Sequence, residues 1–433
     1  MLAIAFVKDS SFDVHLWANR YVASVYERLQ PLIQQRNEQL SHKLSKVLDA
    51  FKSEKVCSQH FSSSTGYGHH DEGREVIDRV FARVLNAQKA SVRLQIVSGT
   101  HAISAALFGV LRPGDSLLSV TGSPYETLEE VIGIRGHGAG SLKDFGVLYN
   151  ELPLAKNGNI DLFALEKILE NPIKMVFIQR SCGYSWRKSI SIDQIELICN
   201  LIHQKSPNTI CFVDNCYGEF VERIEPCGVG ADLIAGSLIK NLGGTIVPTG
   251  GYIAGRSDLV ELASSRVTAP GIGSTGGITF DLNRQVLQGL FLAPQMVTES
   301  LIGADLVRDV FKGLGFKVNP SSEQDRVDII QSVCLGSPQA LKVVCKAFQE
   351  SSPIGSYLEP IPAPMPGYES DLLMAGGTFI DGSTSEFSAD APLREPYNLF
   401  VQGGSHHEHV KIALIQALVA LEKAKLIKIN HNI

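Results

Sequence analysis

The chain has 433 residues, of which 44% are hydrophobic and 19% are charged. This composition supports a sizeable buried core, predicts one or two domains, and excludes a disordered polymer or a fibrous repeat. With 39 Lys and Arg against 45 Asp and Glu, the net charge is −6. Such a chain lacks the basic field that attracts nucleic-acid phosphates, so we expect no nucleic-acid partner.

The sequence indicates neither membrane insertion nor export. No stretch approaches the roughly 18 consecutive apolar residues that span a bilayer, and the opening run MLAIAFV reaches Lys8 and Asp9 without a basic segment before it. We therefore expect a soluble, cytoplasmic protein with no membrane partner. The eight cysteines are dilute and include no Cys-x-x-Cys pair. This favours reduced thiols over disulfides and gives no indication of a zinc site.

Residues 1–56 are predicted to form an N-terminal helical arm. Apolar residues recur at helical spacing from about residue 16 to residue 51, and Pro31 interrupts the pattern, so we expect two helices that pack on another part of the structure. The small, polar segment FSSSTGYG at 61–68 predicts a loop. The next helix is expected to run through Val76, Val80 and Val84.

Residues 57–300 alternate short apolar strands with helices, which predicts a large α/β domain. Several strands lack polar alternation, as is typical of a largely parallel sheet with helices on both faces. In such sheets the ligand binds beyond the carboxyl ends of the strands, so the residues after each strand are candidates for function. The expected strands are 94–97, 116–120, 175–178, 210–214, 232–235 and 252–254.

Residues 301–433 change in character and predict a smaller α+β domain. A helix is expected at 301–314, a strand at 316–318, and a terminal amphipathic helix from about 407 to 425. Between them lie a proline-rich segment at 352–367 and a Gly/Ser-rich segment at about 376–385.

The first chemical signal is Ser98-Gly99-Thr100, which lies between an expected strand and an apolar-faced helix. Glycine lets a ligand approach the backbone closely, and the first N–H groups of a helix lack partners within the helix, so this turn is suited to bind an anion. Taken alone, an ordinary turn with a Ser or Thr N-cap is the more frequent explanation. Neither GxxxxGK[ST] nor GxGxxG occurs here, which argues against a nucleoside triphosphate or a dinucleotide.

Two further signals follow strands later in the chain. Asp214 ends an apolar strand in CFVDNCYGE, where its carboxylate can bind a metal, act as a base, or hold a cationic ring nitrogen. Lys240 follows another strand in GSLIKNLGG. Apolar surroundings disfavour the ammonium form of a lysine and free its amine to attack an aldehyde. A solvent-exposed lysine is the alternative.

Taken together, the three signals are the ordered set that pyridoxal 5′-phosphate requires. Ser98, Gly99, Thr100 and Ser237 would hold the phosphate. Asp214 would keep the ring nitrogen protonated, so that the ring accepts electrons, and Lys240 would form a Schiff base with the aldehyde.

On these residues the chain resembles the fold-type-I pyridoxal 5′-phosphate enzymes of cysteine and methionine metabolism. It is most similar to the branch called methionine-gamma-lyase-like or aluminium-resistance proteins. The resemblance implies a large domain with a mostly parallel, seven-stranded sheet flanked by helices, a smaller C-terminal α+β domain and an N-terminal helical arm. Its motifs are TGYGHHDEGRE, SGTHAI, RSCGYSWRKS, DNCYGEF, GSLIKNLGG, TGGYIAGR and REPYNLFVQGG.

The resemblance also implies roles for single residues. Tyr125 would stack on the cofactor ring and donate a proton to a leaving group, with an ordinary turn tyrosine after Pro124 as the alternative. Arg394 would bind the substrate carboxylate through a two-point fork, with an exposed loop arginine as the alternative. Arg180 and Tyr184 follow a strand and would face the same edge, in contact with the ring hydroxyl or the substrate.

By the same resemblance, the Tyr67 loop reaches the cofactor phosphate of a neighbouring subunit. This implies a homodimer at least, and a homotetramer is expected. The position that usually carries an arginine two residues later is His69 here, and Asn241 with the residues after it departs from the Lys-Tyr pair of better-characterised lyases. The loop GIGSTGG at 271–277 would close over the site or complete the partner's phosphate site, with plain loop flexibility as the alternative.

The expected function is a carbon–sulfur lyase that acts on a sulfur-containing amino acid by β- or γ-elimination and releases a thiol, ammonia and a 2-oxo acid. Transamination or racemisation would use the same Asp214 and Lys240. A regulatory protein that binds the cofactor or an amino acid without turnover is the alternative from another class. We expect no metal, because the cluster at 405–409 lacks HExxH spacing and opens a helix.

Overall fold

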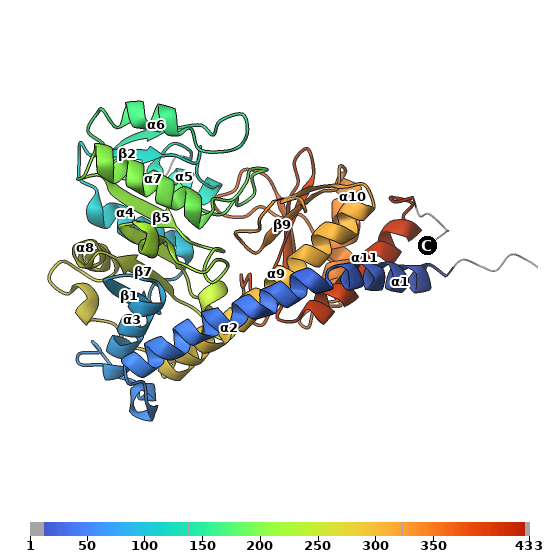
Figure 1. Ribbon diagram of the computed structural model, residues 1–433, viewed down its shortest axis with the longest axis horizontal. Helices are drawn as coiled ribbons and strands as arrows, with labels where there is room; N and C mark the ends of the chain where they lie inside the picture. Colours follow the sequence, from blue (N-terminus) through green and yellow to red (C-terminus); the bar gives the residue numbers. More distant parts are fainter. Residues whose placement is uncertain (1–12, 137–138, 323, 429–433) are drawn as a thin grey trace, which may run out of the picture.

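The computed structural model describes residues 13–136, 139–322 and 324–428, so the opening apolar run at 1–7 lies outside the described residues. Two β-sheets organise the chain, one in a larger unit and one in a smaller unit (Figure 1). The long helices α2 (Gln30–Ser53) and α9 (Asn283–Gly313) run side by side between these units.

The larger sheet has seven strands in the order β1-β7-β6-β5-β4-β2-β3. Neighbours from β3 to β6 are parallel, whereas β7 is antiparallel to both β6 and β1. The mostly parallel α/β sheet expected from the sequence is therefore confirmed. The strands are β1 Lys89–Arg93, β2 Ser116–Ser119, β3 Leu148–Glu151, β4 Met175–Gln179, β5 Ile210–Asp214, β6 Leu233–Ser237 and β7 Gly251–Gly255.

Helices cover both faces of this sheet, and strand side chains alternate between the two layers. On β4, Met175 and Phe177 pack with α4, α5 and α8, whereas Val176 and Ile178 pack with α3, α6, α7 and part of α9. The central strands β4 and β5 are buried on both faces, which explains their continuous apolar runs. The helices are α3 Glu72–Val84, α4 Gly99–Val110, α5 Glu126–Ile132, α6 Leu162–Ile168, α7 Ile192–Lys205 and α8 Ser257–Val267, with 3-10 turns Ser58–Phe61, Pro226–Val229, Asn241–Gly243 and Gly273–Thr275.

The smaller sheet is antiparallel throughout, in the order β10-β11-β12-β9-β8. Its apolar residues form one core with residues of α1, α10, α11 and the second half of α9. The elements are β8 Lys317–Asn319, β9 Ile330–Cys334, α10 Pro338–Glu350, β10 Leu372–Ala375, β11 Ser388–Pro392, β12 Asn398–Gln402 and α11 His407–Lys423.

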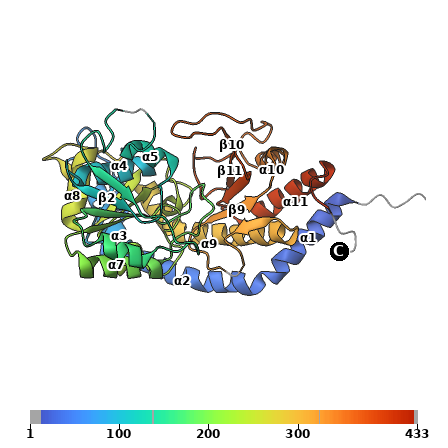
Figure 2. The same ribbon diagram turned by 90° about the horizontal axis from the view of Figure 1, so that it is seen from above.

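The N-terminal residues form two helices, as expected, and both pack on the rest of the chain. α1 (Val14–Arg28) lies beside α11, and α2 begins with Pro31 in its first turn (Figures 1 and 2). Arg36 of α2 pairs with the buried Asp305 of α9 at 3.0 Å, and Arg308 and Arg326 bind the same carboxylate. These contacts attach the two helices to the smaller unit.

Three expectations for the elements were wrong. Residues 94–97 form a turn after β1, which ends at Arg93, and Val97 is 73% exposed. The edge strand β3 was not expected, because its residues are mostly exposed and alternate with polar ones. The helix expected at 301–314 is the second half of α9, which begins at Asn283.

Helix α9 is long and apolar enough to cross a membrane by length and composition, and no second such helix occurs in the described parts of the chain. In the structure, 72% of its most apolar window is buried. It contributes residues to the cores of both units, which accounts for its apolar composition.

Candidate active site

A cavity of about 500 Å³ opens at the carboxyl edge of the larger sheet. It gathers nine of the residues predicted to form the site. The predicted lining residues are Ser98, Gly99, Thr100, Tyr125, Tyr184, Asp214, Ser237, Lys240 and Arg394. Further lining residues include Gln179, Cys216, Tyr217 and Tyr368.

The N-terminus of α4 forms one wall of the cavity. Ser98 is its N-cap, and Ser98 Oγ accepts a hydrogen bond from the N–H of His101 at 3.0 Å. A Cβ at Gly99 would lie 3.0 Å from Cys216 Sγ, so a larger residue here would crowd the neighbouring loop. Glycine therefore leaves the first N–H groups of α4 open to an anion in the cavity.

Strand parity brings the polar residues of three strands to the same face. Gln179, Asp214 and Ser237 end β4, β5 and β6 and lie on the sheet face that packs with α4. The register pairs Gln179 with Asp214 directly. Gln179 had not been assigned a role, although its position at a strand end was a usable signal. Its amide oxygen accepts from the Tyr125 N–H at 2.8 Å and so positions that residue.

Asp214 lies buried at the floor of the cavity, where its Oδ1 accepts from the Cys216 N–H at 3.1 Å. Burial raises the pKa of Asp214, and the Cys216 N–H and the Lys240 cation only partly oppose this effect. A cationic partner inside the cavity would therefore be strongly favoured, because it would stabilise the carboxylate form.

Lys240 Nζ lies 3.6 Å from the centre of the Tyr217 ring. Burial lowers the pKa of Lys240, but the Tyr217 hydroxyl, the Cys216 thiol and Asp214 outweigh burial and leave this pKa raised. The chain turns sharply around Lys240, and Gly243 closely approaches the backbone before it. A Cβ at Gly243 would lie 1.7 Å from the Leu238 carbonyl oxygen, so only glycine fits there. The sequence motif GSLIKNLGG thus has a steric reason for its first terminal glycine.

Tyr217 was missed as a site residue in the sequence. It follows Asp214 by three residues in DNCYGEF and has a left-handed backbone with φ of 71°. This geometry turns the chain sharply after β5, with the Tyr217 ring against Lys240. An aromatic residue in an unusual turn after a functional strand was the available signal.

Tyr125 lies at the start of α5, and its hydroxyl is 2.9 Å from Thr100 Oγ1. Burial, with a smaller effect from Asp214, raises the pKa of Tyr125 well above its ordinary value. The phenol therefore keeps its proton at neutral pH and can donate it. This placement agrees with the stacking and proton-donating roles predicted for Tyr125, which stay predictions.

Arg394 reaches the rim of the cavity from the smaller unit, where its Nη1 donates to Glu126 Oε1 at 2.6 Å. Tyr184 also faces the cavity, and its hydroxyl donates to Asp390 Oδ2 at 2.9 Å. Its ring packs against Tyr368, with 5.5 Å between ring centres. Arg394 and Tyr184, two of the three residues predicted to contact the substrate, thus line the cavity, and each is oriented by a carboxylate; their contact with a substrate stays a prediction.

Arg180 does not reach the cavity, contrary to expectation. Its guanidinium is fully buried and donates to Asn215 Oδ1 at 2.6 Å and Glu222 Oε2 at 2.7 Å. The reason is strand parity, because residue 180 points to the opposite sheet face from Gln179. Arg180 supports the loop after β5 and does not line the cavity.

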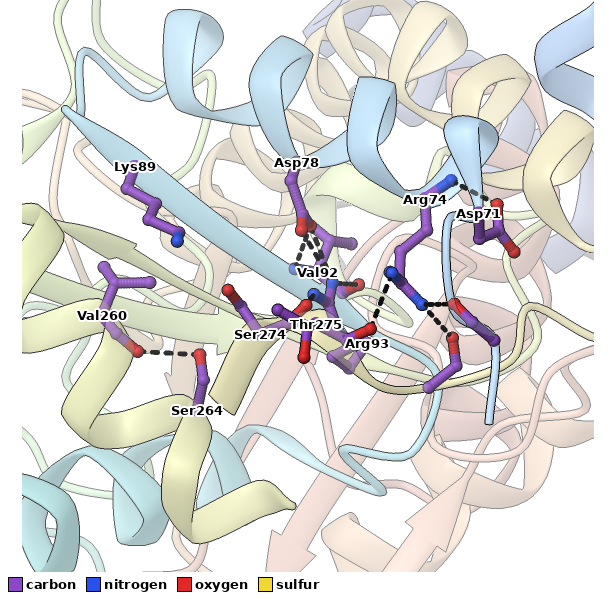
Figure 3. Close-up of polar contacts among 12 residues, drawn as sticks. Asp71, Arg74, Asp78, Lys89, Val92, Arg93, Val260, Ser264, Ser274 and Thr275 are labelled. Carbon is purple, nitrogen blue, oxygen red and sulfur yellow. Dashed lines mark hydrogen bonds and ion pairs between the residues drawn. The ribbon is translucent and has the colours of Figure 1, made fainter. Parts of the chain in front are cut away.

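Tyr67 lies outside the cavity of its own chain and is 82% exposed. Its carbonyl accepts from the Gly277 N–H at 3.2 Å, so the Tyr67 loop and the glycine-rich loop are joined. Arg74 donates to the carbonyls of Gly277 and Thr275 at 2.8 and 2.9 Å. Arg93 donates to the carbonyl of Ser274 (Figure 3). The contact of these loops with a neighbouring subunit stays a prediction.

A family model described as methionine gamma-lyase matches residues 18–422. The chain belongs to the methionine gamma-lyase family. It is 46% identical over 407 residues to the uncharacterized protein YnbB of Bacillus subtilis (strain 168). The aligned residues cover 94% of this chain and 95% of YnbB. Members of this family are fold-type-I enzymes, and their cofactor is pyridoxal 5′-phosphate.

Solved structures agree with this assignment. A proposed cystathionine beta-lyase involved in aluminium resistance from Listeria monocytogenes is 46% identical, with a TM-score of 0.89 over 92% of this chain and 98% of that chain. A carbon-sulfur lyase involved in aluminium resistance from Clostridium novyi NT is 44% identical, with a TM-score of 0.88 over 95% and 99%.

The residues of the cavity fit the cofactor of the family. The open α4 N-terminus and Ser237 offer N–H and hydroxyl donors to a phosphate. The buried Asp214 accepts from the Cys216 N–H through Oδ1, and its carboxylate has further lone pairs to accept from a ring N–H. Lys240 lies in the same cavity and carries the amine that an aldehyde requires.

Proposed function

We propose that this protein is a pyridoxal 5′-phosphate-dependent carbon–sulfur lyase that acts on a small sulfur-containing amino acid. It would break the bond between sulfur and Cβ or Cγ and release a thiol, ammonia and a 2-oxo acid. The observation that supports this most directly is that Lys240, Asp214 and the α4 N-terminus line one cavity with Arg394 at its rim.

The bound cofactor supplies an electron sink for the carbanion that forms at Cα of the amino acid. Asp214 would hold the proton on the ring nitrogen, because a buried carboxylate gains most from a cationic donor. Ser98, Gly99, Thr100 and Ser237 would hold the phosphate.

Lys240 Nζ is the group placed to move a proton. Its amine would take the proton from Cα of the substrate, and Tyr217 would keep this amine against the floor of the cavity. Tyr125, whose hydroxyl is protonated at neutral pH, would donate a proton to the departing sulfur.

Arg394 would bind the substrate carboxylate, for which it must exchange its contact with Glu126. This exchange would let the rim reorganise when a substrate enters. Tyr184, oriented by Asp390, would contact the substrate from the opposite wall.

Three further expectations belong to this proposal. The enzyme would be a homodimer at least and a homotetramer as the expected state, with Tyr67 contributing to the site of a neighbouring subunit. It would act on a small-molecule substrate, and it would be cytoplasmic.

The test is to record the absorption spectrum of the purified protein and to incubate it with cysteine, cystathionine or methionine. Pyruvate from cysteine or cystathionine would indicate β-elimination, and 2-oxobutyrate from methionine would indicate γ-elimination. Lys240→Ala should abolish product formation and the visible cofactor band, whereas the exposed Lys188→Ala should change neither.

Three results would contradict the proposal. Product that appears only with an added 2-oxo acid acceptor indicates transamination, and loss of optical purity without a 2-oxo acid indicates racemisation. A coloured protein that yields no product from any sulfur-containing amino acid indicates a binding protein.

A further inference from the structure

A second cluster of reactive side chains lies at the opposite edge of the larger sheet from the catalytic cavity. Cys199 and His203 are four residues apart on α7 and so share one helix face. Cys211 is near the beginning of β5, and Asp232 immediately precedes β6. Asp214 and Ser237 are at the carboxyl ends of the same two strands, so the strands separate this cluster from the catalytic residues.

The distances within this cluster match a tetrahedral metal site. Cys211 Sγ lies 3.8 Å from His203 Nε2, and His203 Nε2 lies 3.0 Å from Asp232 Oδ2. With Zn–S bonds of about 2.3 Å and Zn–N bonds of about 2.0 Å, a tetrahedral ion separates a sulfur and a nitrogen ligand by roughly 3.6 Å. The ligand atoms of these three residues all lie within 4.8 Å of one another.

The Cys199 thiol lies next to this cluster but is not one of its three ligand groups. Its interaction with the Cys211 thiol, ahead of burial, raises the pKa of Cys211 well above its ordinary value. Cys199 and Cys211 are fully buried, whereas the side chain of His203 is 37% exposed and leaves a path from solvent. A metal would enter past His203 and displace the Cys211 thiol proton, with water at the fourth position.

The charge of the cluster balances that of a divalent ion. The Cys211 thiolate and the Asp232 carboxylate carry two negative charges, and a divalent ion supplies two positive charges. Arg256 Nη1 lies 3.4 Å from Asp232 Oδ1, but the guanidinium pairs more closely with Asp258, at 2.7 Å. The N–H of Cys211 donates to Asp232 Oδ2 at 2.8 Å and orients the carboxylate.

The described residues contain one other histidine cluster, formed by Glu299, His406 and His407. Its contacts are explained by helix packing. Both ring nitrogens of His407 have partners, since Nδ1 lies 2.7 Å from Glu299 Oε2 and Nε2 lies 3.1 Å from the Tyr26 hydroxyl. This arrangement explains the packing of α11 on α1 and needs no ion.

We propose that His203, Cys211 and Asp232, with water as the fourth ligand, form a binding site for a thiophilic divalent cation such as Zn²⁺. One sulfur ligand and one nitrogen ligand favour Zn²⁺ over Mg²⁺ or Ca²⁺, which prefer oxygen. The site joins α7 to the first residues of β5 and β6 and would stabilise the fold without taking part in catalysis. It is independent of the proposed reaction.

The test uses the reduced, cofactor-loaded protein after treatment with a chelator. After loading with Zn²⁺ and desalting, elemental analysis should find one Zn²⁺ per chain, and the melting temperature should rise. Loading with Mg²⁺ should change neither. A Co²⁺-loaded sample, measured as a difference spectrum against the Zn²⁺ sample to cancel the cofactor absorption, should show tetrahedral visible bands and a thiolate charge-transfer band.

His203→Gln and Cys211→Ser should each lower Zn²⁺ affinity by at least about tenfold, since even outer contacts of a metal site contribute 10–100-fold. His203 is partly exposed, so its variant should fold even if Cys211→Ser does not. Cys211→Ser should abolish the thiolate band, because it removes the sulfur ligand, whereas Cys199→Ser should keep this band. A control double variant, Cys345→Ser with His42→Gln, changes a buried thiol and a surface histidine outside the cluster and should bind Zn²⁺ like the wild type.

Several outcomes would overturn the proposal. They are wild-type protein that retains no Zn²⁺ after desalting, a His203→Gln variant that binds Zn²⁺ like the wild type, and an undiminished thiolate band in Cys211→Ser. Activity of the enzyme is not used as a readout, so failure of this site leaves the proposed lyase reaction untouched.

Discussion

Asp214→Asn isolates the charge of the carboxylate at the floor of the cavity. Asparagine has nearly the same shape and its side-chain oxygen can still accept from the Cys216 N–H, now at 3.1 Å, so the fold should be preserved. What is lost is the negative charge opposite a cationic ring nitrogen. Removal of one partner from a buried, hydrogen-bonded charge pair costs about 2–5 kcal/mol. At about 1.36 kcal/mol per factor of ten, kcat/KM should fall roughly 30- to 5,000-fold.

The assay follows release of 2-oxo acid from the best of the three test substrates, together with cofactor content. A matched control is Asp328→Asn, which changes another buried, hydrogen-bonded aspartate that does not line the catalytic cavity. The control is expected to lose stability but to keep kcat/KM within a few-fold for the folded protein. If Asp214→Asn retains the cofactor and at least a third of wild-type kcat/KM, the assignment of Asp214 to the ring nitrogen is refuted.

The pH profile gives a second readout for the same variant. Burial raises the pKa of Asp214 in the cofactor-free protein, so cofactor uptake by the wild type should decline as the pH falls through this raised value and the carboxylate becomes protonated, which gives the uptake profile an acid limb. Asp214→Asn has no such group and should lack this acid limb. An identical acid limb in both proteins would assign the titration to another group.

Three further predictions concern residues around the site and between the units. Arg180→Gln should lower the free energy of unfolding by about 3–5 kcal/mol, because it leaves Glu222 without its buried partner; unchanged stability with a large rise in KM would restore a substrate role. Asp305→Asn should cost about 3–5 kcal/mol at pH 7. Burial opposes the ionised form of Asp305, but its three arginines outweigh burial and lower the pKa of Asp305. The ion pairs therefore stabilise the fold fully above the unfolded pKa of about 3.9 and lose this effect as the pH falls through the folded pKa. Urea midpoints should therefore differ between wild type and variant at pH 7 and converge in acid, and a constant difference would contradict this sign. Tyr217→Phe should lower the pKa of Lys240, because burial depresses this pKa and the Tyr217 hydroxyl raises it. Cofactor uptake by the cofactor-free protein should then shift to lower pH. An unchanged uptake profile would argue against this contact.

Strand ends were the most predictable part of the site. Asp214 and Lys240 could be recognised because each follows a continuous apolar run, and burial on both faces leaves no polar alternation to obscure such runs. The turn at Ser98 was placed correctly before α4 even though the strand expected before it was misplaced. The helix signal there is local, since it depends on one N-cap side chain and the glycine after it.

Arg180 shows where this reasoning failed although the information was present. Residues one apart on a strand point to opposite faces, so Gln179 and Arg180 cannot both face the cavity. Which face carries the cavity depends on the packing of α4, α5 and α8, and this packing involves residues far apart in the chain. The same uncertainty hid Cys211, which faces α7 and the proposed metal site.

The sequence alone determined the α/β class, the order of the helices and most strands, and which residues are candidates to bind the cofactor, because these depend on local periodicity and on residue chemistry. Only the tertiary structure decided that Arg394 from the smaller unit reaches the same cavity as Lys240, that Tyr217 lies against this lysine, and that His203 meets Cys211 and Asp232. Those contacts join residues from separate elements, and their distances follow from how the sheet faces and helices pack, which no local pattern records.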